Sequence, residues 1–194
     1  MEVKDLHLVE EPKKVLRMNP KKFALWLFIV SIVMIFASLT SAYIVKMADG
    51  EWLIYDLPNI FWINSIIILM SSATMQWAVV SARKDNITNV KIAMLATIVL
   101  GVGFLYGQFL AWRDLVEIGV YFVGNASGSF LYVITGVHGF HLITGLVFIL
   151  IVMNATFRYK VHSRNLLTIE MCATYWHFLD GLWLYLFIFL LLNH

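Results

Sequence analysis

Two acidic side chains and a histidine stand inside the last apolar stretch of this chain. Glu170 opens the run EMCATYWHFLDGLWLYLFIFLLLNH, and His177 and Asp180 follow it, three residues apart. A charged side chain at the centre of a bilayer costs roughly 3 kcal/mol on insertion scales. If this stretch crosses a membrane, Asp180 must therefore face protein or water, be paired, or carry a proton.

A second polar face lies in an earlier stretch, in the segment ITGVHGFHLITG at residues 134–145. Its Thr135, His138 and His141 recur every three residues, a spacing that places them on one side of a helix. The glycines among them allow close helix approach, and histidine or threonine can hydrogen-bond across such a contact. We therefore expect the two segments to pair, with this face supplying hydrogen bonds to His177 and Asp180.

This pairing is expected to form a structural polar seam, in which Asp180 fixes the packing of the last helix. The predicted members of the seam are His138, His141, Glu170, His177 and Asp180. No catalytic residue, metal site or cofactor site is expected among them, because H-x-x-H beside an aspartate is a weak metal signal. A hydrolytic zinc site would also need a nearby acid and a polar cavity.

Other interpretations of the same residues stay open. Two histidines on different helices could hold one haem, as in a haem-binding membrane anchor of a respiratory complex. His138 and His141 are too close together in sequence for a stacked pair of haems. A proton relay through Asp180 and Glu170 is a further interpretation, since carboxylates within a membrane are often functional. A small transporter is the third interpretation.

The composition indicates the elements that must position these residues. The chain has 194 residues, of which 61% are hydrophobic and 13% charged, and its mean hydropathy is +0.81. A soluble domain would carry about 25% charged residues. The net charge of +2 gives no reason to expect nucleic acid as a partner. The single cysteine, Cys172, excludes a disulfide within the chain.

Five long uncharged stretches predict an all-α integral membrane bundle of five transmembrane helices, occupying residues 23–194. About 20 apolar residues suffice to cross a bilayer core. The predicted spans are about 23–46, 60–81, 92–112, 130–157 and 170–192. Residues 1–22 are predicted to form a cytoplasmic arm, too short to build a core of its own. The segment VGNASGS has turn chemistry and is predicted to precede the fourth helix as a loop.

The distribution of lysine and arginine predicts the orientation of the bundle. The six segments outside the spans carry six, one, three, one, three and no basic residues in turn. Loops on the cytoplasmic side of a membrane are enriched in Lys and Arg. The alternation therefore predicts an N-terminus inside and a C-terminus outside.

Two segments then resemble a known family. YWHFLDGLWLYLF (175–187) and TGVHGFHLITG (135–145) are similar to the two hallmark segments of subunit III of haem–copper terminal oxidases, whose usual forms are close to Y-W-H-F-V-D-x-x-W-L-F and T-G-x-H-G-x-H-V-x-x-G. Glu170 also falls at the family position five residues before Y-W-H-F. Weaker similarity extends the resemblance over about residues 23–194.

The chain also departs from the longer members of this family. Those have seven helices, and this chain resembles them from their third helix on, as five-helix forms of bacterial quinol oxidases and some bacterial cytochrome c oxidases do. Ile32 stands where the family often has a buried carboxylate. A role that depends on that carboxylate is therefore not carried over.

The resemblance implies a non-redox subunit of a proton-pumping oxidase that reduces dioxygen to water in aerobic respiration, in the bacterial inner membrane. Haem and copper would belong to partner subunits. This chain would stabilise catalytic subunit I, beside subunit II and small subunits, and a respiratory supercomplex is a further expected partner. It would support proton uptake and hold phospholipid that eases dioxygen access. Arg158, a cation at the end of the fourth span, is a candidate for a lipid headgroup.

Overall fold

The computed structural model describes residues 19–50, 52–157 and 166–193. Five long α-helices account for most of these residues, and no strand occurs among them. The helices are α1 (Pro20–Met47), α2 (Ile60–Arg83), α3 (Ile87–Glu117), α4 (Ala126–Phe157) and α5 (Leu167–Leu192). All five are long and apolar enough to cross a membrane. The predicted all-α bundle of five transmembrane helices is therefore confirmed.

Several helices extend beyond the uncharged stretches that suggested them. α1 begins at Pro20, because proline is tolerated in the first turn and the Asn19 side chain accepts a hydrogen bond from the backbone N–H of Lys21 at 3.0 Å. α4 begins at Ala126, inside the segment predicted as a loop. There the Asn125 side chain accepts from the N–H of Ser127 at 2.8 Å. Asn125, which was expected to lie in a loop, therefore caps the first turn of α4 instead.

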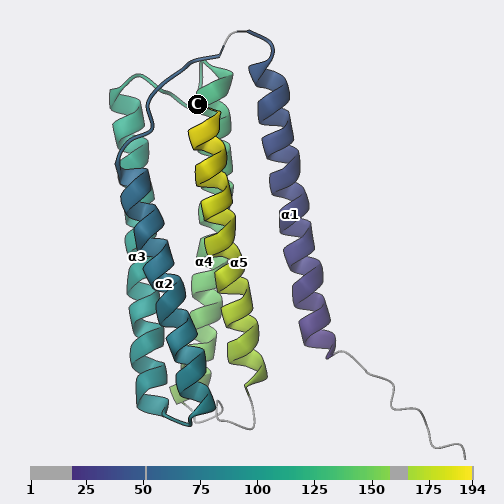
Figure 1. Cartoon of the computed structure of the whole chain (residues 1–194), viewed down its shortest axis with the longest axis vertical. Coiled ribbons are helices and arrows are strands. Elements are labelled where there is room, and N and C mark those ends of the chain that lie inside the picture. Colours follow the sequence, from purple (N-terminus) through teal and green to yellow (C-terminus); the bar gives the residue numbers. More distant parts are fainter. Residues whose placement is uncertain (1–18, 51, 158–165, 194) are drawn as a thin grey trace, which may run out of the picture.

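The helices run alternately up and down, so that the start of α1, the α2–α3 turn and the start of α5 lie at one end (Figure 1). The C-terminal end of α5 lies at the other end. α5 contacts α1, α2 and α4, whereas α1 contacts only α4 and α5 among the described helices. Figure 1 shows α1 standing at one side of the other four. α5, which carries most of the predicted seam, is therefore the helix that both α1 and α2 contact.

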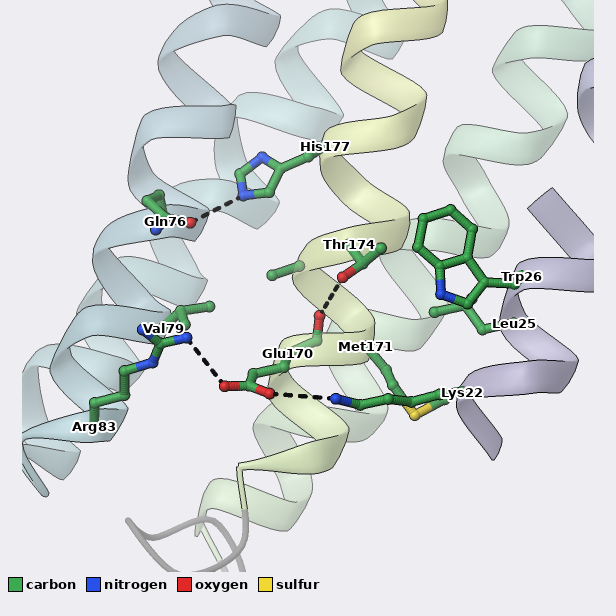
Figure 2. Close-up of a pocket in the computed structure, with 11 residues that line it drawn as sticks. Lys22, Leu25, Trp26, Gln76, Val79, Arg83, Glu170, Met171, Thr174 and His177 are labelled. Carbon is green, nitrogen blue, oxygen red and sulfur yellow. Dashed lines mark hydrogen bonds and ion pairs between the residues drawn. The ribbon is translucent and has the colours of Figure 1, made fainter. Parts of the chain in front are cut away.

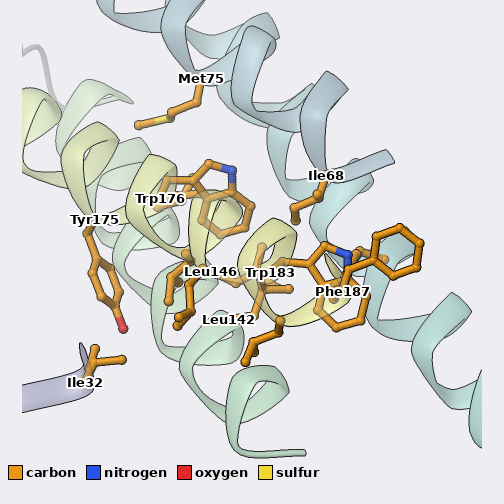
Figure 3. Packing of buried hydrophobic residues seen from close by; sticks show 14 of the residues in the cluster. Ile32, Ile68, Met75, Leu142, Leu146, Tyr175, Trp176, Trp183 and Phe187 are labelled. Atoms are coloured by element: carbon orange, nitrogen blue, oxygen red, sulfur yellow. The ribbon is translucent and has the colours of Figure 1, made fainter. Parts of the chain in front are cut away.

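Two tryptophans of α5 fill the centre of the bundle (Figure 3). Trp176 and Trp183 are fully buried. Glycines on neighbouring helices make room for the first of them. A Cβ atom on Gly101 of α3 would lie 2.9 Å from the Trp176 ring, and one on Gly145 of α4 would lie 3.2 Å from it. These two glycines therefore let α3 and α4 pack closely around the Trp176 ring of α5.

The end of the bundle that holds the C-terminus is joined by side-chain bonds to backbone oxygens. The Tyr43 hydroxyl of α1 donates to the Asn193 carbonyl at 2.8 Å. The Ser127 hydroxyl of α4 donates to the Leu53 carbonyl, in the connection between α1 and α2, at 3.0 Å. These contacts hold α1 and the first connection against the helices that carry the seam.

Candidate functional site

Glu170, in the first turn of α5, joins three helices. One carboxylate oxygen accepts from Arg83 Nη2 of α2 at 3.1 Å, and the other lies 3.8 Å from Lys22 Nζ of α1 (Figure 2). The three side chains are 32%, 59% and 45% exposed, respectively. At such exposure each pair contributes about 0–1 kcal/mol. The two ion pairs therefore add little to the stability of the bundle, and their main effect is to hold the ends of three helices in position.

A cleft of about 360 Å³ opens between α1, α2 and α5 beside these charges. Lys22, Arg83 and Glu170 line its charged end. Gln76, Thr174 and His177 line it further along α2 and α5, and Leu25, Trp26 and Val79 supply apolar wall (Figure 2). Polar side chains thus continue from the end of the bundle into a segment that spans a membrane.

His177 closes the far end of this cleft and hydrogen-bonds to α2. Its Nδ1 lies 2.6 Å from the Ser72 hydroxyl, and its Nε2 lies 3.3 Å from Gln76 Oε1. Since an amide oxygen only accepts, Nε2 carries the proton in the neutral ring, and Nδ1 accepts from Ser72. The prediction that helix four supplies the partner of His177 is therefore wrong. The side chain turns toward α2.

Asp180 lies one turn further along α5 and is 3% exposed. Neither carboxyl oxygen has a hydrogen-bond partner among the described residues. The nearest ionisable atom is His177 Nδ1, 4.0 Å from Asp180 Oδ2, which is too long for a hydrogen bond. The hydrogen bonds to Asp180 that were expected from His138, His141 or Thr135 are absent from the described part of the chain.

The two histidines of α4 lie in a different part of the bundle. His138 is fully buried, and neither ring nitrogen has a partner within the described ranges. Its ring centroid lies 5.2 Å from that of Trp183 and 5.9 Å from that of Phe104. His141 Nδ1 donates to the Val137 carbonyl of its own helix at 2.8 Å. The structure therefore divides the predicted seam into a group on α5 that faces α2 and a pair on α4.

Sequence analysis missed the polar side chains of α2. Ser65, Ser71, Ser72 and Gln76 all hydrogen-bond to side chains of α5. The signal that could have found them is spacing, because Ser65 and Ser72 are seven residues apart and Gln76 follows four residues later. Such intervals place side chains on one helical face. Serine is common in transmembrane helices, which weakened this signal.

Asn64 and Gln108 are two further polar side chains enclosed between helices. Asn64 of α2 is 1% exposed and Gln108 of α3 is 4% exposed, and neither amide group has a partner in the residues that the structure covers. A Cβ atom on Gly107 would collide with the Asn64 side chain. The glycine therefore allows α2 and α3 to pack closely around this amide.

In the described ranges, no group of three or more His, Cys, Asp or Glu side chains is arranged to hold a metal ion. Arg158, the candidate for a lipid headgroup, lies outside the described residues.

Comparison with known proteins decides the family. The model of the family described as cytochrome c oxidase subunit III matches residues 54–193, well over half of the chain. The chain belongs to the cytochrome c oxidase subunit III family. The resemblance seen in the two histidine-containing segments is thereby confirmed.

Relatives in this family come from more than one kind of oxidase. Cytochrome bo(3) ubiquinol oxidase subunit 3 of Buchnera aphidicola subsp. Schizaphis graminum is 30% identical over 90% of this chain and 95% of its own length. Cytochrome c oxidase subunit 3 of Bacillus sp. (strain PS3) is 27% identical over 86% of this chain and 83% of its own. The Loxodonta africana subunit 3 is 33% identical, but the match covers only 47% of that protein. The matches thus cover most of the length of both bacterial relatives.

Proposed function

We propose that this chain is a non-redox subunit III of a proton-pumping haem–copper terminal oxidase in a bacterial inner membrane. In this proposal it stabilises catalytic subunit I, supports proton uptake, and holds phospholipid near a path for dioxygen. Haem and copper belong to the partner subunits, subunit II and small subunits complete the assembly, and a supercomplex is a further partner. The observation that carries the proposal is the match over nearly the full length of a ubiquinol oxidase subunit 3.

The arrangement of the bundle supports this role. Many large apolar side chains on the outward faces of α1 and α2 are exposed, among them Met34, Val45, Ile63 and Ile66. Such faces fit lipid or the helices of a larger subunit. The Lys and Arg distribution of the sequence supports an orientation with the N-terminus inside. In that orientation the Lys22–Glu170–Arg83 cluster lies at the inner surface, from which an oxidase takes up protons.

A gentle pull-down tests the proposal. The full chain, tagged and expressed in its host, is extracted in mild detergent, and the eluate is analysed by mass spectrometry, haem spectrum and dioxygen consumption. We expect subunits I and II together with oxidase activity, and the form of subunit II will identify cytochrome c or quinol as the electron donor. Recovery of the chain without either subunit would contradict the proposal. A haem spectrum from the isolated chain would favour the membrane-anchor interpretation.

Reporter fusions test the orientation. A reporter after His194 should behave as periplasmic, and one inserted between Arg83 and Lys91 should behave as cytoplasmic. The reverse pattern at either position would contradict the proposed topology.

A further inference from the structure

Asp180 is a carboxyl group that the bundle encloses and that no described cation neutralises. It is 3% exposed, both oxygens lack a hydrogen-bond partner in the described residues, and no cation lies in direct contact with it. An isolated carboxylate in such surroundings is far too costly to persist. The group therefore persists as the neutral acid, unless water reaches it.

A route for water leads almost to this group. The cleft between α1, α2 and α5 starts at Lys22, Arg83 and Glu170 and ends at His177 (Figure 2). Its volume of about 360 Å³ is large enough to admit water, and its lining offers polar partners. The His177 side chain is 33% exposed and that of Asp180 is 4% exposed. His177 thus stands between the cleft and the buried acid.

The hydrogen bonds of His177 orient its two nitrogens for proton transfer. Nε2 faces the cleft and donates to Gln76, which is itself exposed. Nδ1 accepts from Ser72 and lies 4.0 Å from Asp180 Oδ2. Imidazole can accept a proton at one nitrogen and release one from the other.

We propose that Asp180 is a proton-binding site that exchanges with water at the membrane face of Lys22 and Arg83, through His177 and the cleft. In the release step the Asp180 carboxyl gives its proton to His177 Nδ1, which leaves a carboxylate and an imidazolium. The imidazolium then gives its Nε2 proton to water in the cleft, which leaves a neutral ring that carries its proton on Nδ1. The reverse sequence reloads the acid, and neither direction needs another reactant.

The charged groups on the helices around Asp180 are compatible with this exchange. α5 itself offers His177 and, at the cleft mouth, Glu170, while α1 and α2 add Lys22 and Arg83 there. α4 contributes two histidines to the interior, and both hold other contacts: His138 packs between rings, and His141 bonds to its own helix. The Tyr132 hydroxyl of α4 bonds to the Val120 carbonyl. α3 carries its charged residues only near its ends. His177 is therefore the ionisable neighbour through which Asp180 exchanges.

Infrared spectroscopy of the full chain in lipid nanodiscs, with whichever subunits co-purify, tests the inference. We expect a carboxylic acid C=O band in the wild type that Asp180→Asn removes. This band should shift soon after transfer to D₂O, and it should weaken reversibly as the pH is raised. His177→Gln can hydrogen-bond to Ser72 or Gln76 but cannot pass a proton. It should slow the D₂O shift about a hundredfold, the lower range of what a positioned proton carrier contributes.

Thr174→Val is the matched control, because Thr174 lines the same cleft and, among the described residues, its hydroxyl bonds only to the Glu170 carbonyl. Its band should shift at the wild-type rate. Absence of an Asp180 band at every pH, or equal slowing in His177→Gln and Thr174→Val, would overturn the inference. Isotope-labelled aspartate in the wild type identifies the band if Asp180→Asn does not fold.

This experiment is independent of the proposed function, because it needs no partner subunit. Failure of the chain to recover oxidase subunits would leave a measured exchange standing. Absence of exchange would leave the assignment to an oxidase untouched.

Discussion

Trp176 of α5 donates its indole N–H to the Ser71 hydroxyl of α2 at 3.0 Å, in the centre of the bundle. Seven residues further along α5, Trp183 does the same to Ser65 at 3.1 Å. Seven residues are about two helical turns, so both bonds lie on one side of α5. Both indoles are fully buried, and water cannot replace either bond. The pair of bonds therefore fixes the register of α5 against α2.

Ser71→Ala should destabilise the bundle by about 1–3 kcal/mol, because it leaves a buried indole N–H without an acceptor. The measurement is an SDS unfolding titration of the purified chain. Ser38→Ala is the matched control, since Ser38 is exposed and bonds only to the Ile35 carbonyl of its own helix. The control should change the free energy of unfolding by less than about 0.5 kcal/mol. Equal losses in the two variants would contradict the role of the indole bond.

Gly145→Ala should also destabilise the bundle, by about 1–3 kcal/mol, because the new methyl overpacks the contact between α4 and α5. A Cβ atom there would lie 3.0 Å from Leu179 and 3.2 Å from Trp176. Gly181→Ala is the control, since nothing lies within 4 Å of a Cβ at that position of α5. Alanine is the better helix former by about 1 kcal/mol, so the control should stabilise the helix. A shift of both variants in the same direction would contradict this account.

The sequence predicted the helices and the polar positions on α5 for a simple physical reason. Membrane thickness sets a minimum length for an apolar span, and a charge within one needs an explanation, which made Asp180 conspicuous. The residues at which the helices begin were less predictable. Pro20 and Ala126 begin their helices through the capping side chains of Asn19 and Asn125. A capping residue and a turn residue have the same chemistry, so sequence alone does not separate them.

The partner of His177 could not be predicted, because a helical stripe does not say which neighbouring helix it faces. α5 contacts three other helices, and all three carry polar side chains that are buried in the bundle. Spacing favours the histidines of α4 as partners of His177, but large rings occupy the space around His138. The azimuth of each helix is decided by packing of bulky residues such as Trp183. That information is distributed over all five helices.

Glu170→Gln should loosen the start of α1, since it removes the charge that Lys22 and Arg83 share. We expect a loss of less than about 1 kcal/mol at low salt, and a smaller loss at high salt, because the pairs are partly exposed. Hydrogen exchange at the first amides of α1 measures the effect locally. Asp49→Asn, which breaks the exposed Lys46–Asp49 pair at the other end of α1, is the control and should leave those amides unchanged. A loss that does not depend on salt would contradict an ionic origin.

His138→Leu should leave the unfolding free energy unchanged or raise it by up to about 2 kcal/mol, because the imidazole is fully buried and no hydrogen bond to it is described. Replacing an unsatisfied polar group with an apolar one of similar size removes its desolvation penalty. The control is His177→Leu, which loses two hydrogen bonds to α2 and should be destabilising. The haem-to-protein ratio of the assembled complex is the second measurement, and it should stay at the wild-type value in both variants while the subunit remains bound. Loss of one haem equivalent from the His138→Leu complex, with the subunit still present, would show that the ring is a ligand. That loss would outweigh the stability measurement. A histidine that binds a haem iron is buried because it binds the metal, whereas the packing of Phe104 and Trp183 would then be secondary.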